Sequence, residues 1–233
     1  MERRMILSIL AAAALGFVGI MLLLPDERDE DPTPRLPWLV EWDGQGRTRV
    51  FGFTLGVTPL SEVQRVFAEA GEINLFAKLD GNQQATDFGV EAYFEQIYLS
   101  RLRGDFVIGI QADAATLAPM YERGLRISQL GSGAKKVELD PADIATLVSL
   151  PIASITYLPW KSLDAEIVTK RFGTPAERRV EPETGVTHWL YPERGMDLAI
   201  DKKGGVVIQY VDPEAFGRLI QPLEGLAGPQ SSP

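Results

Sequence analysis

The one histidine of this 233-residue chain, His188, is the first candidate for acid–base or binding chemistry, because only histidine ordinarily titrates near neutral pH. It lies in Val186-Thr-His-Trp-Leu-Tyr-Pro192, which is predicted to be a strand. On that strand His188 and Leu190 share one face, and Trp189 and Tyr191 share the other. If Trp189 and Tyr191 point into the core, His188 is a surface histidine. If they point outward, they form an exposed aromatic patch and His188 is half-buried. A structural histidine is the favoured interpretation, with partner binding or general-base catalysis as alternatives.

Residues for catalysis or metal binding are otherwise scarce. The chain has no cysteine, which excludes disulfides, thiolate metal sites and cysteine nucleophiles, and a single histidine excludes two-His metal sites. No Gly-x-Ser-x-Gly or Ser-x-x-Lys pattern supplies a nucleophile. Asp140, Asp143, Asp164 and Glu166 stand at predicted helix starts, where capping explains them. We therefore predict a protein that is not an enzyme and needs no cofactor or metal.

Aromatic side chains are the better candidates for binding. Trp160 lies in the turn Leu158-Pro-Trp-Lys161 beside a predicted helix, and tryptophan is enriched at protein interfaces because it buries a large area with little loss of rotamer freedom. Trp38 and Trp42 stand where the folded body begins, and core packing is the default for them. The predicted partner-binding candidates are Trp160, His188, Trp189 and Tyr191.

The elements that position these residues form an internal repeat. Residues 51–67 and 155–172 each read as a short strand, a turn and a helix that ends near a phenylalanine. After each helix the apolar period changes towards two, which predicts antiparallel strands joined by turns, such as the turn at 201–205. The predicted strands are 73–79, 88–94, 97–102 and 106–111 in the first copy, and 176–180, 187–191, 196–200 and 206–211 in the second.

The two repeat helices are predicted from apolar stripes at helical spacing. The stripes are Leu60, Val63, Val66, Phe67 and Ala70 in the first helix, and Leu163, Ile167, Val168 and Phe172 in the second. Thr58 is the predicted N-cap of the first helix, with Pro59 in its first turn. Ser162 or Asp164 caps the second helix, and Gly173 ends it.

Other segments connect these units. Further helices are predicted at 114–123, 141–149 and 213–220. The segment 125–139 lacks the spacing of a phosphate-binding loop and is predicted to be a flexible connection between the two halves. Arg103-Gly-Asp105 is predicted to be a hairpin turn.

A helix followed by a meander, present twice, resembles the modules of the SmpA/OmlA-type outer-membrane assembly lipoproteins and of the β-lactamase inhibitor proteins. The resemblance lies in Leu55-Gly-Val-Thr-Pro-Leu-Ser-Glu-Val63 and Phe172-Gly-Thr-Pro175. It implies a domain that binds another protein through a sheet face or a helix edge, and it assigns no site residues. The chain departs from those modules because it lacks a lipidated cysteine and their other cysteines.

The N-terminus is predicted to be a membrane anchor. Residues 5–24 form twenty uncharged, mostly apolar positions, and a helix of that length spans about 30 Å, the thickness of the hydrocarbon layer. Arg3 and Arg4 precede the segment and an acidic cluster follows it, which places the N-terminus in the cytoplasm and the body in the bacterial periplasm. The alternative is a cleaved signal peptide, but the run is long and ends in Leu22-Leu-Leu-Pro25.

The small residues Ser8, Ala12 and Gly16 recur every fourth position of this segment and are candidates for contact with a second membrane helix. The predicted organisation is an anchor at 1–24, an acidic proline-rich linker at 25–37, α+β units at 38–124 and 151–220 joined by a connecting segment at 125–150, and a flexible tail at 221–233.

Charge and composition narrow the function. A formal net charge of −9 argues against nucleic-acid binding. We predict a membrane-anchored periplasmic module that binds an envelope protein. The alternative is a sensor that binds a small ligand in a cleft between the two units.

Overall fold

The structure, a computed structural model, describes residues 34–82 and 84–224. Five α-helices and thirteen strands among them form an α+β fold, which confirms the predicted class. The predicted anchor with Ser8, Ala12 and Gly16 lies outside the described residues. Within the described ranges, no helix has the length and apolar character needed to cross a bilayer.

Ten strands pair antiparallel in one large sheet, in the order β10-β11-β12-β13-β9-β6-β5-β4-β8-β7. Their bounds are β4 Glu72–Leu79, β5 Ala85–Leu99, β6 Leu102–Ile110, β7 Arg126–Gln129, β8 Lys135–Glu138, β9 Ile152–Pro159, β10 Glu177–Val180, β11 Thr187–Tyr191, β12 Met196–Ile200 and β13 Val206–Tyr210. Strands from both predicted units contribute, and β6 pairs with β9 where the units meet. The strands of the two copies of the repeat therefore belong to one continuous sheet.

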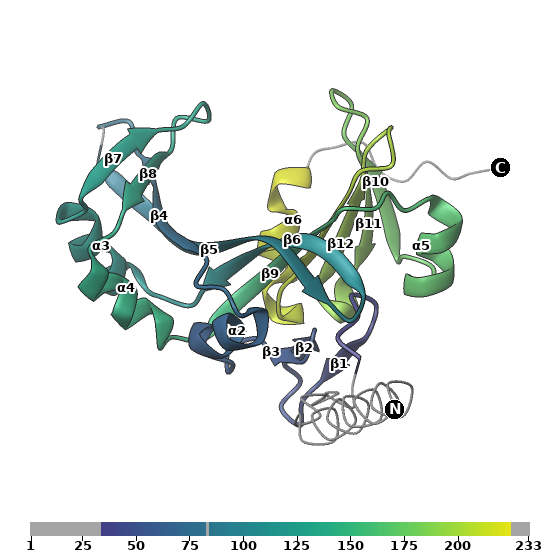
Figure 1. Cartoon of the computed structure of the whole chain (residues 1–233). Coiled ribbons are helices and arrows are strands. Elements are labelled where there is room, and N and C mark those ends of the chain that lie inside the picture. Colours follow the sequence, from purple (N-terminus) through teal and green to yellow (C-terminus); the bar gives the residue numbers. More distant parts are fainter. Residues whose placement is uncertain (1–33, 83, 225–233) are drawn as a thin grey trace, which may run out of the picture. The chain divides into compact units, whose positions relative to one another are not determined.

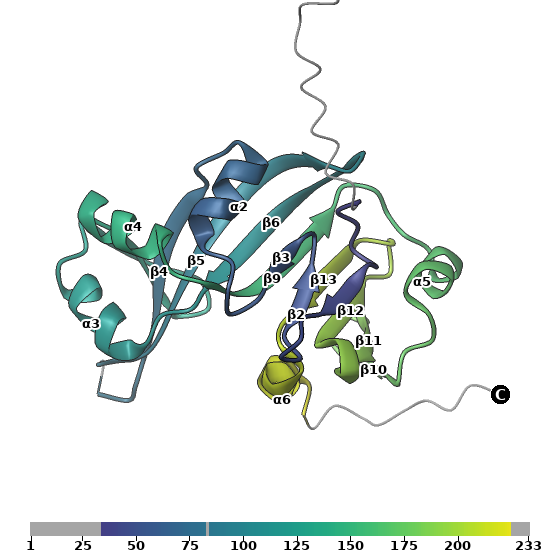
Figure 2. The ribbon, with the colours of Figure 1, turned by 90° about the horizontal axis from the view of Figure 1, so that it is seen from below.

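The sheet is curved, and most of the helices lie along its outer side (Figure 1). The helices α2 (Leu60–Phe67), α3 (Ala114–Glu122), α4 (Pro141–Val148) and α5 (Ala165–Phe172) share one apolar core with the sheet. A small sheet of β1 (Val40–Trp42), β2 (Thr48–Val50) and β3 (Phe53–Thr54) joins that core. The short helix α6 (Phe216–Ile220) packs on the opposite face against Leu190 (Figure 2).

Strict alternation explains why one face of the sheet is buried. Along β6, residues 104, 106, 108 and 110 are buried, whereas Arg103, Asp105, Val107 and Gly109 face the other way and are more exposed. An antiparallel sheet with one covered face is expected to show this pattern. The less covered face of the central strands is the concave side of the curved sheet (Figure 1).

The helix-capping predictions had mixed outcomes. Asp164 caps α5, because its carboxylate accepts a hydrogen bond from the Ile167 N–H at 2.8 Å, and Gly173 ends that helix as predicted. Thr58 does not cap α2: Pro59 occupies the N-cap position, and the Thr58 hydroxyl accepts from the Thr54 N–H at 2.9 Å instead. The Thr58 hydroxyl therefore stabilises the turn before α2 and does not cap the helix itself.

The predicted hairpin turn at Arg103-Gly-Asp105 is wrong, because these residues lie inside β6. The turn is formed by Ser100 and Arg101, whose φ angles are +46° and +67°. Gly104 is required by close packing, since a Cβ atom there would lie 2.4 Å from the ring of Tyr157. The glycine that suggested a turn thus marks the crossing of a buried ring over a strand.

The predicted flexible loop at 125–139 is also wrong. Residues of this segment form the hairpin β7–β8, and β8 pairs with β4 at the end of the large sheet. Val137 is fully buried, which ties the hairpin to the core. The polar sequence of β7 conceals the strand, because all four of its residues are exposed.

Three further assignments change with the structure. Asp143 is buried and bound by the Arg123 guanidinium, so it is not a simple capping residue, whereas Asp140 does cap α4. The predicted linker is packed at its end, where the Pro37 carbonyl accepts a hydrogen bond from the buried Tyr210 hydroxyl. Residues 221–223, predicted to belong to a flexible tail, form a 3₁₀ turn that buries Leu223.

Candidate partner-binding surface

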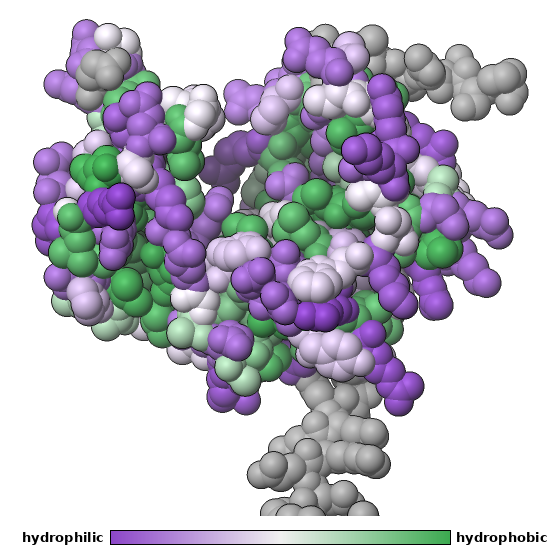
Figure 3. Space-filling model, turned by 45° about the horizontal axis from the view of Figure 1, so that its top comes forward, coloured by the Kyte–Doolittle hydropathy of each residue, from purple (hydrophilic) through white to green (hydrophobic). Residues whose placement is uncertain are grey.

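Three exposed aromatic side chains and one arginine lie on the open face of the sheet. Tyr93 and Tyr98 come from β5, Arg103 comes from β6, and Trp160 follows β9. Tyr98 is the cross-strand partner of Arg103, and the backbone N–H of Trp160 donates a hydrogen bond to the Arg103 carbonyl at 3.0 Å. We call these four residues the Trp160 patch. The face to which they belong is hollowed between two lobes with hydrophilic rims (Figure 3).

A β-bulge brings the two tyrosines to the same face. Tyr93 and Tyr98 are five residues apart, and in a regular strand they would point to opposite faces. The pairing of β5 with β6 shifts register between Phe94 and Ile97, so β5 has one extra residue there. Tyr98 therefore points to the same face of the sheet as Tyr93. Two separate strands were predicted here, and the structure replaces them with one bulged strand.

Trp160 is half-exposed yet held in place. Its side chain is 49% accessible, its indole N–H donates to Asp105 at 3.0 Å, and the Arg103 guanidinium lies 3.8 Å from its ring centroid. Arg103 is itself held by a hydrogen bond to Gln96. A large aromatic side chain that is already ordered loses little conformational freedom on binding, which favours its use as an anchor.

An acidic cavity of about 580 Å³ adjoins the patch. Tyr93 and Tyr98 line it together with Glu69 and Glu95, and no Lys or Arg is among its lining residues. Burial, with the negative charges of Asp105 and Glu95, raises the pKa of Tyr93. Tyrosine faces and carboxylates both attract cations, so the cavity is suited to a cationic group.

The other predicted partner-binding residues lie elsewhere and are buried. Trp189 and Tyr191 are 4% and 5% exposed and point into the core, and two strands, β12 and β13, lie between β11 and β9 in the sheet. The Tyr191 hydroxyl donates to the Gly173 carbonyl, and the Arg178 guanidinium stacks on Trp189. Of the four candidates, only Trp160 is placed where a partner could reach it in the folded protein.

His188 is buried, not on the surface as expected when Trp189 and Tyr191 point inward. Its Nδ1 lies 2.8 Å from Asp197 and its Nε2 lies 3.2 Å from Glu181, so an imidazolium could donate to both carboxylates. Burial lowers the pKa of His188, but the hydrogen bonds and charges of Asp197 and Glu181 outweigh it and leave the pKa raised. The second oxygen of Asp197 is buried without a hydrogen-bond partner among the described residues. This geometry fits a structural ion cluster.

Neither a search for metal-binding clusters nor comparison with known proteins assigns a further functional site. Over residues 34–82 and 84–224, no group of three or more His, Asp or Glu side chains is arranged to hold a metal ion. Comparison of the chain with protein-family models, curated proteins and solved structures found no match.

Of the four residues of the Trp160 patch, only Trp160 is a binding candidate from the sequence, which does not indicate Tyr93, Tyr98 or Arg103. Both tyrosines fell on predicted strands, and Arg103 was assigned to a turn. A signal was present in the period-two alternation of residues 103 to 109, which places Arg103 opposite the apolar positions of β6. The bulge and the strand order, which decide the neighbours, have no comparable signal.

Proposed function

We propose that this chain is a membrane-anchored protein-interaction module of the bacterial periplasm that binds an envelope protein and has no catalytic activity of its own. The proposal rests mainly on the Trp160 patch, where an ordered, exposed tryptophan, two tyrosines and an arginine lie on an uncovered sheet face. Trp, Tyr and Arg are the residues that dominate binding energy at protein interfaces.

The chemistry beside the patch suggests what the partner presents. Glu69 and Glu95 are without ion pairs to any described residue, and both line the acidic cavity. We propose that the partner inserts a lysine or arginine side chain there, between the two tyrosines. Such a contact would orient the partner on the sheet face by charge complementarity.

Trp160→Ala is expected to reduce partner capture from detergent-solubilised envelopes at least about tenfold, because loss of an interface anchor costs about 2 kcal/mol or more. Trp42→Ala is the matched control, since Trp42 is 48% exposed and lies on the small sheet. Captured proteins are quantified for the full-length chain and both variants. Equal capture by wild type and Trp160→Ala, or equal losses in both variants, would contradict the proposal.

The anchor supplies the rest of the proposal. We infer that residues 5–24 form a retained transmembrane helix, with Ser8, Ala12 and Gly16 available to a second helix. The full-length protein is expected to stay in the membrane pellet after a carbonate wash, and a C-terminal reporter is expected to be active only in the periplasm. A soluble form that begins after residue 25, or a reporter active only in the cytoplasm, would overturn this part.

The alternative of a ligand cleft between the two predicted units has less support. The cavity at the start of β4, the acidic cavity and a third cavity beside Leu79 and Gly133 are all lined by residues of the first unit and of the connecting segment. One of them nevertheless has the features of a small-molecule site.

A further inference from the structure

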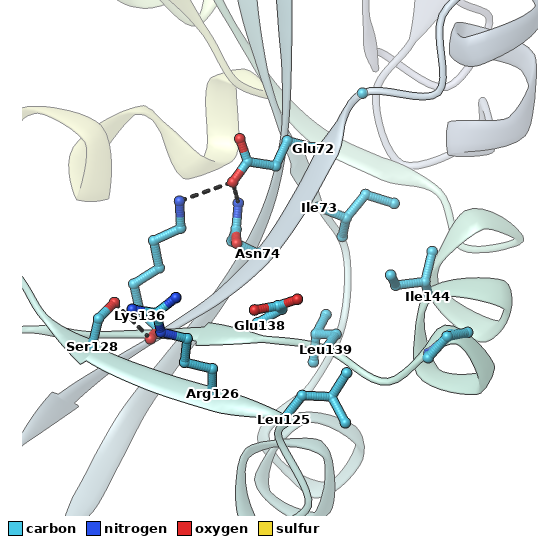
Figure 4. Close-up of a pocket in the computed structure, with 12 residues that line it drawn as sticks. Glu72, Ile73, Asn74, Leu125, Arg126, Ser128, Lys136, Glu138, Leu139 and Ile144 are labelled. Carbon is cyan, nitrogen blue, oxygen red and sulfur yellow. Dashed lines mark hydrogen bonds and ion pairs between the residues drawn. The ribbon is translucent and has the colours of Figure 1, made fainter.

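A cavity of about 570 Å³ lies between the start of β4, the β7–β8 hairpin and the start of α4. This volume is typical of small-molecule sites. Its lining divides into two parts: charged and amide side chains lie on one side, and Ile73, Leu125, Leu139 and Ile144 lie on the other (Figure 4). A ligand that fills it should therefore have a polar and an apolar part.

Two of the charges in the cavity neutralise each other. The Glu72 carboxylate accepts hydrogen bonds from the Lys136 ammonium and from the Asn74 amide nitrogen, each at 3.0 Å (Figure 4). Both contacts lower the pKa of Glu72, so this carboxylate stays charged. Asn74 is 7% exposed, and the hydrogen bond from its amide nitrogen to Glu72 fixes the orientation of the amide. The amide oxygen of Asn74 has no hydrogen-bond partner among the described residues.

The remaining polar groups form a row across three strands. Asn74 on β4 is paired with Glu138 on β8, and Glu138 is paired with Arg126 on β7. Neither the Glu138 carboxylate nor the Arg126 guanidinium takes part in an ion pair within the described ranges. Neighbouring strands are about 4.8 Å apart, so the row places a neutral acceptor, an anion and a cation within reach of one small molecule.

We propose that this cavity binds a zwitterionic α-amino acid with an aliphatic side chain. The ligand ammonium donates to the Asn74 amide oxygen and the Glu138 carboxylate, and the ligand carboxylate pairs with the Arg126 guanidinium. The aliphatic side chain lies against Leu125 and Ile144, the two apolar lining residues that are not fully buried in the core. The site is independent of the partner proposed above, although the cavity adjoins the acidic cavity at Gly71.

Calorimetric titration of the full-length chain in a non-ionic detergent tests this assignment, with L-leucine as the probe. We expect saturable binding of L-leucine. N-acetyl-L-leucine, which lacks the ammonium, and L-leucinamide, which lacks the carboxylate, should each bind at least about tenfold more weakly, the loss of about 1.4 kcal/mol. Equal binding of L-leucine and either blocked form, or no saturable binding at all, would overturn the proposal.

Variants locate the site. Arg126→Gln and Glu138→Gln are each expected to weaken L-leucine binding at least about tenfold. Arg65→Gln and Glu62→Gln are the matched controls, because they remove an exposed Arg–Glu pair on α2. Weakening by the controls as large as by the cavity variants would place the binding elsewhere. Trp160→Ala should leave L-leucine binding unchanged, so a failure of the partner proposal can be distinguished from a failure of this one.

Discussion

His188→Ala is expected to lower the free energy of unfolding by about 3–5 kcal/mol, because it leaves a buried carboxylate without its partner. Asp197 is 3% exposed, and one of its oxygens already lacks a hydrogen bond from the described residues. Removal of the imidazole would also take away the contact of the other oxygen. Urea unfolding of the wild type and the variant, followed by circular dichroism, measures the loss.

The same cluster should make stability depend on pH. The pKa of His188 is raised in the folded protein, so its stabilisation is complete below the unfolded-state value of about 6.5 and is lost as pH rises through the folded-state value. The pKa of Glu181 is lowered, first by the Thr184 hydroxyl and then by His188, so its contribution is lost only in acid. The nearby Arg179 forms an ion pair with Glu177, and the hydrogen bond to that carboxylate raises the pKa of Arg179. Arg179 therefore keeps its charge over this pH range.

We therefore expect the wild type to be more stable at about pH 6 than at about pH 8.5. His188→Gln is the control, because glutamine can still donate to Asp197 but does not titrate. Its unfolding free energy should change much less between the two pH values. An equal pH dependence in the two proteins would assign the effect to other groups and contradict the ion-cluster interpretation.

Gly195→Ala is expected to destabilise the fold by about 3 kcal/mol or more, since it combines two penalties. Gly195 has a φ of +58°, a left-handed conformation that costs other residues about 1–2 kcal/mol. A Cβ atom there would lie 1.9 Å from the Val211 carbonyl oxygen, which is backbone and cannot rotate away. Overpacking of this kind adds about 1–3 kcal/mol.

Gly46→Ala separates the two penalties. Gly46 has a φ of +78°, and nothing lies within 4 Å of a Cβ atom built on it. Its substitution should cost only the conformational part, about 1–2 kcal/mol, in the same urea measurement. If both variants lose the same stability, the close approach of Val211 to Gly195 has no energetic effect.

Local pattern was sufficient for much of the second half of the body. The strands β11 and β12 have the predicted bounds, because each is a short and largely apolar run that is bordered by turn residues. The α5 helix follows from its apolar stripe, its Asp164 cap and the terminal Gly173. These signals lie within a few residues of each other, so no knowledge of distant contacts was needed.

Prediction failed where a distant segment supplies the stabilisation. The strand β7 is exposed along its whole length and exists because it pairs with β8, which in turn pairs with β4 about sixty residues earlier in the chain. His188 was misplaced because both faces of β11 are covered: Trp189 meets the main core, and Leu190 meets the α6 region. Alternation indicates which residues share a face but not whether another layer covers it.

Composition and order of residues by themselves determined the α+β class, the α3, α4 and α5 helices, the meander of the second half and the choice of Trp160 as a binding candidate. Only the tertiary structure decided that both halves share one sheet, that a bulge puts Tyr98 on the same face as Tyr93, and that Asn74, Glu138 and Arg126 form one row. The physical reason is the range of the interactions. Helix caps and strand alternation act between near neighbours in the chain, whereas strand pairing and register join residues that the sequence keeps far apart.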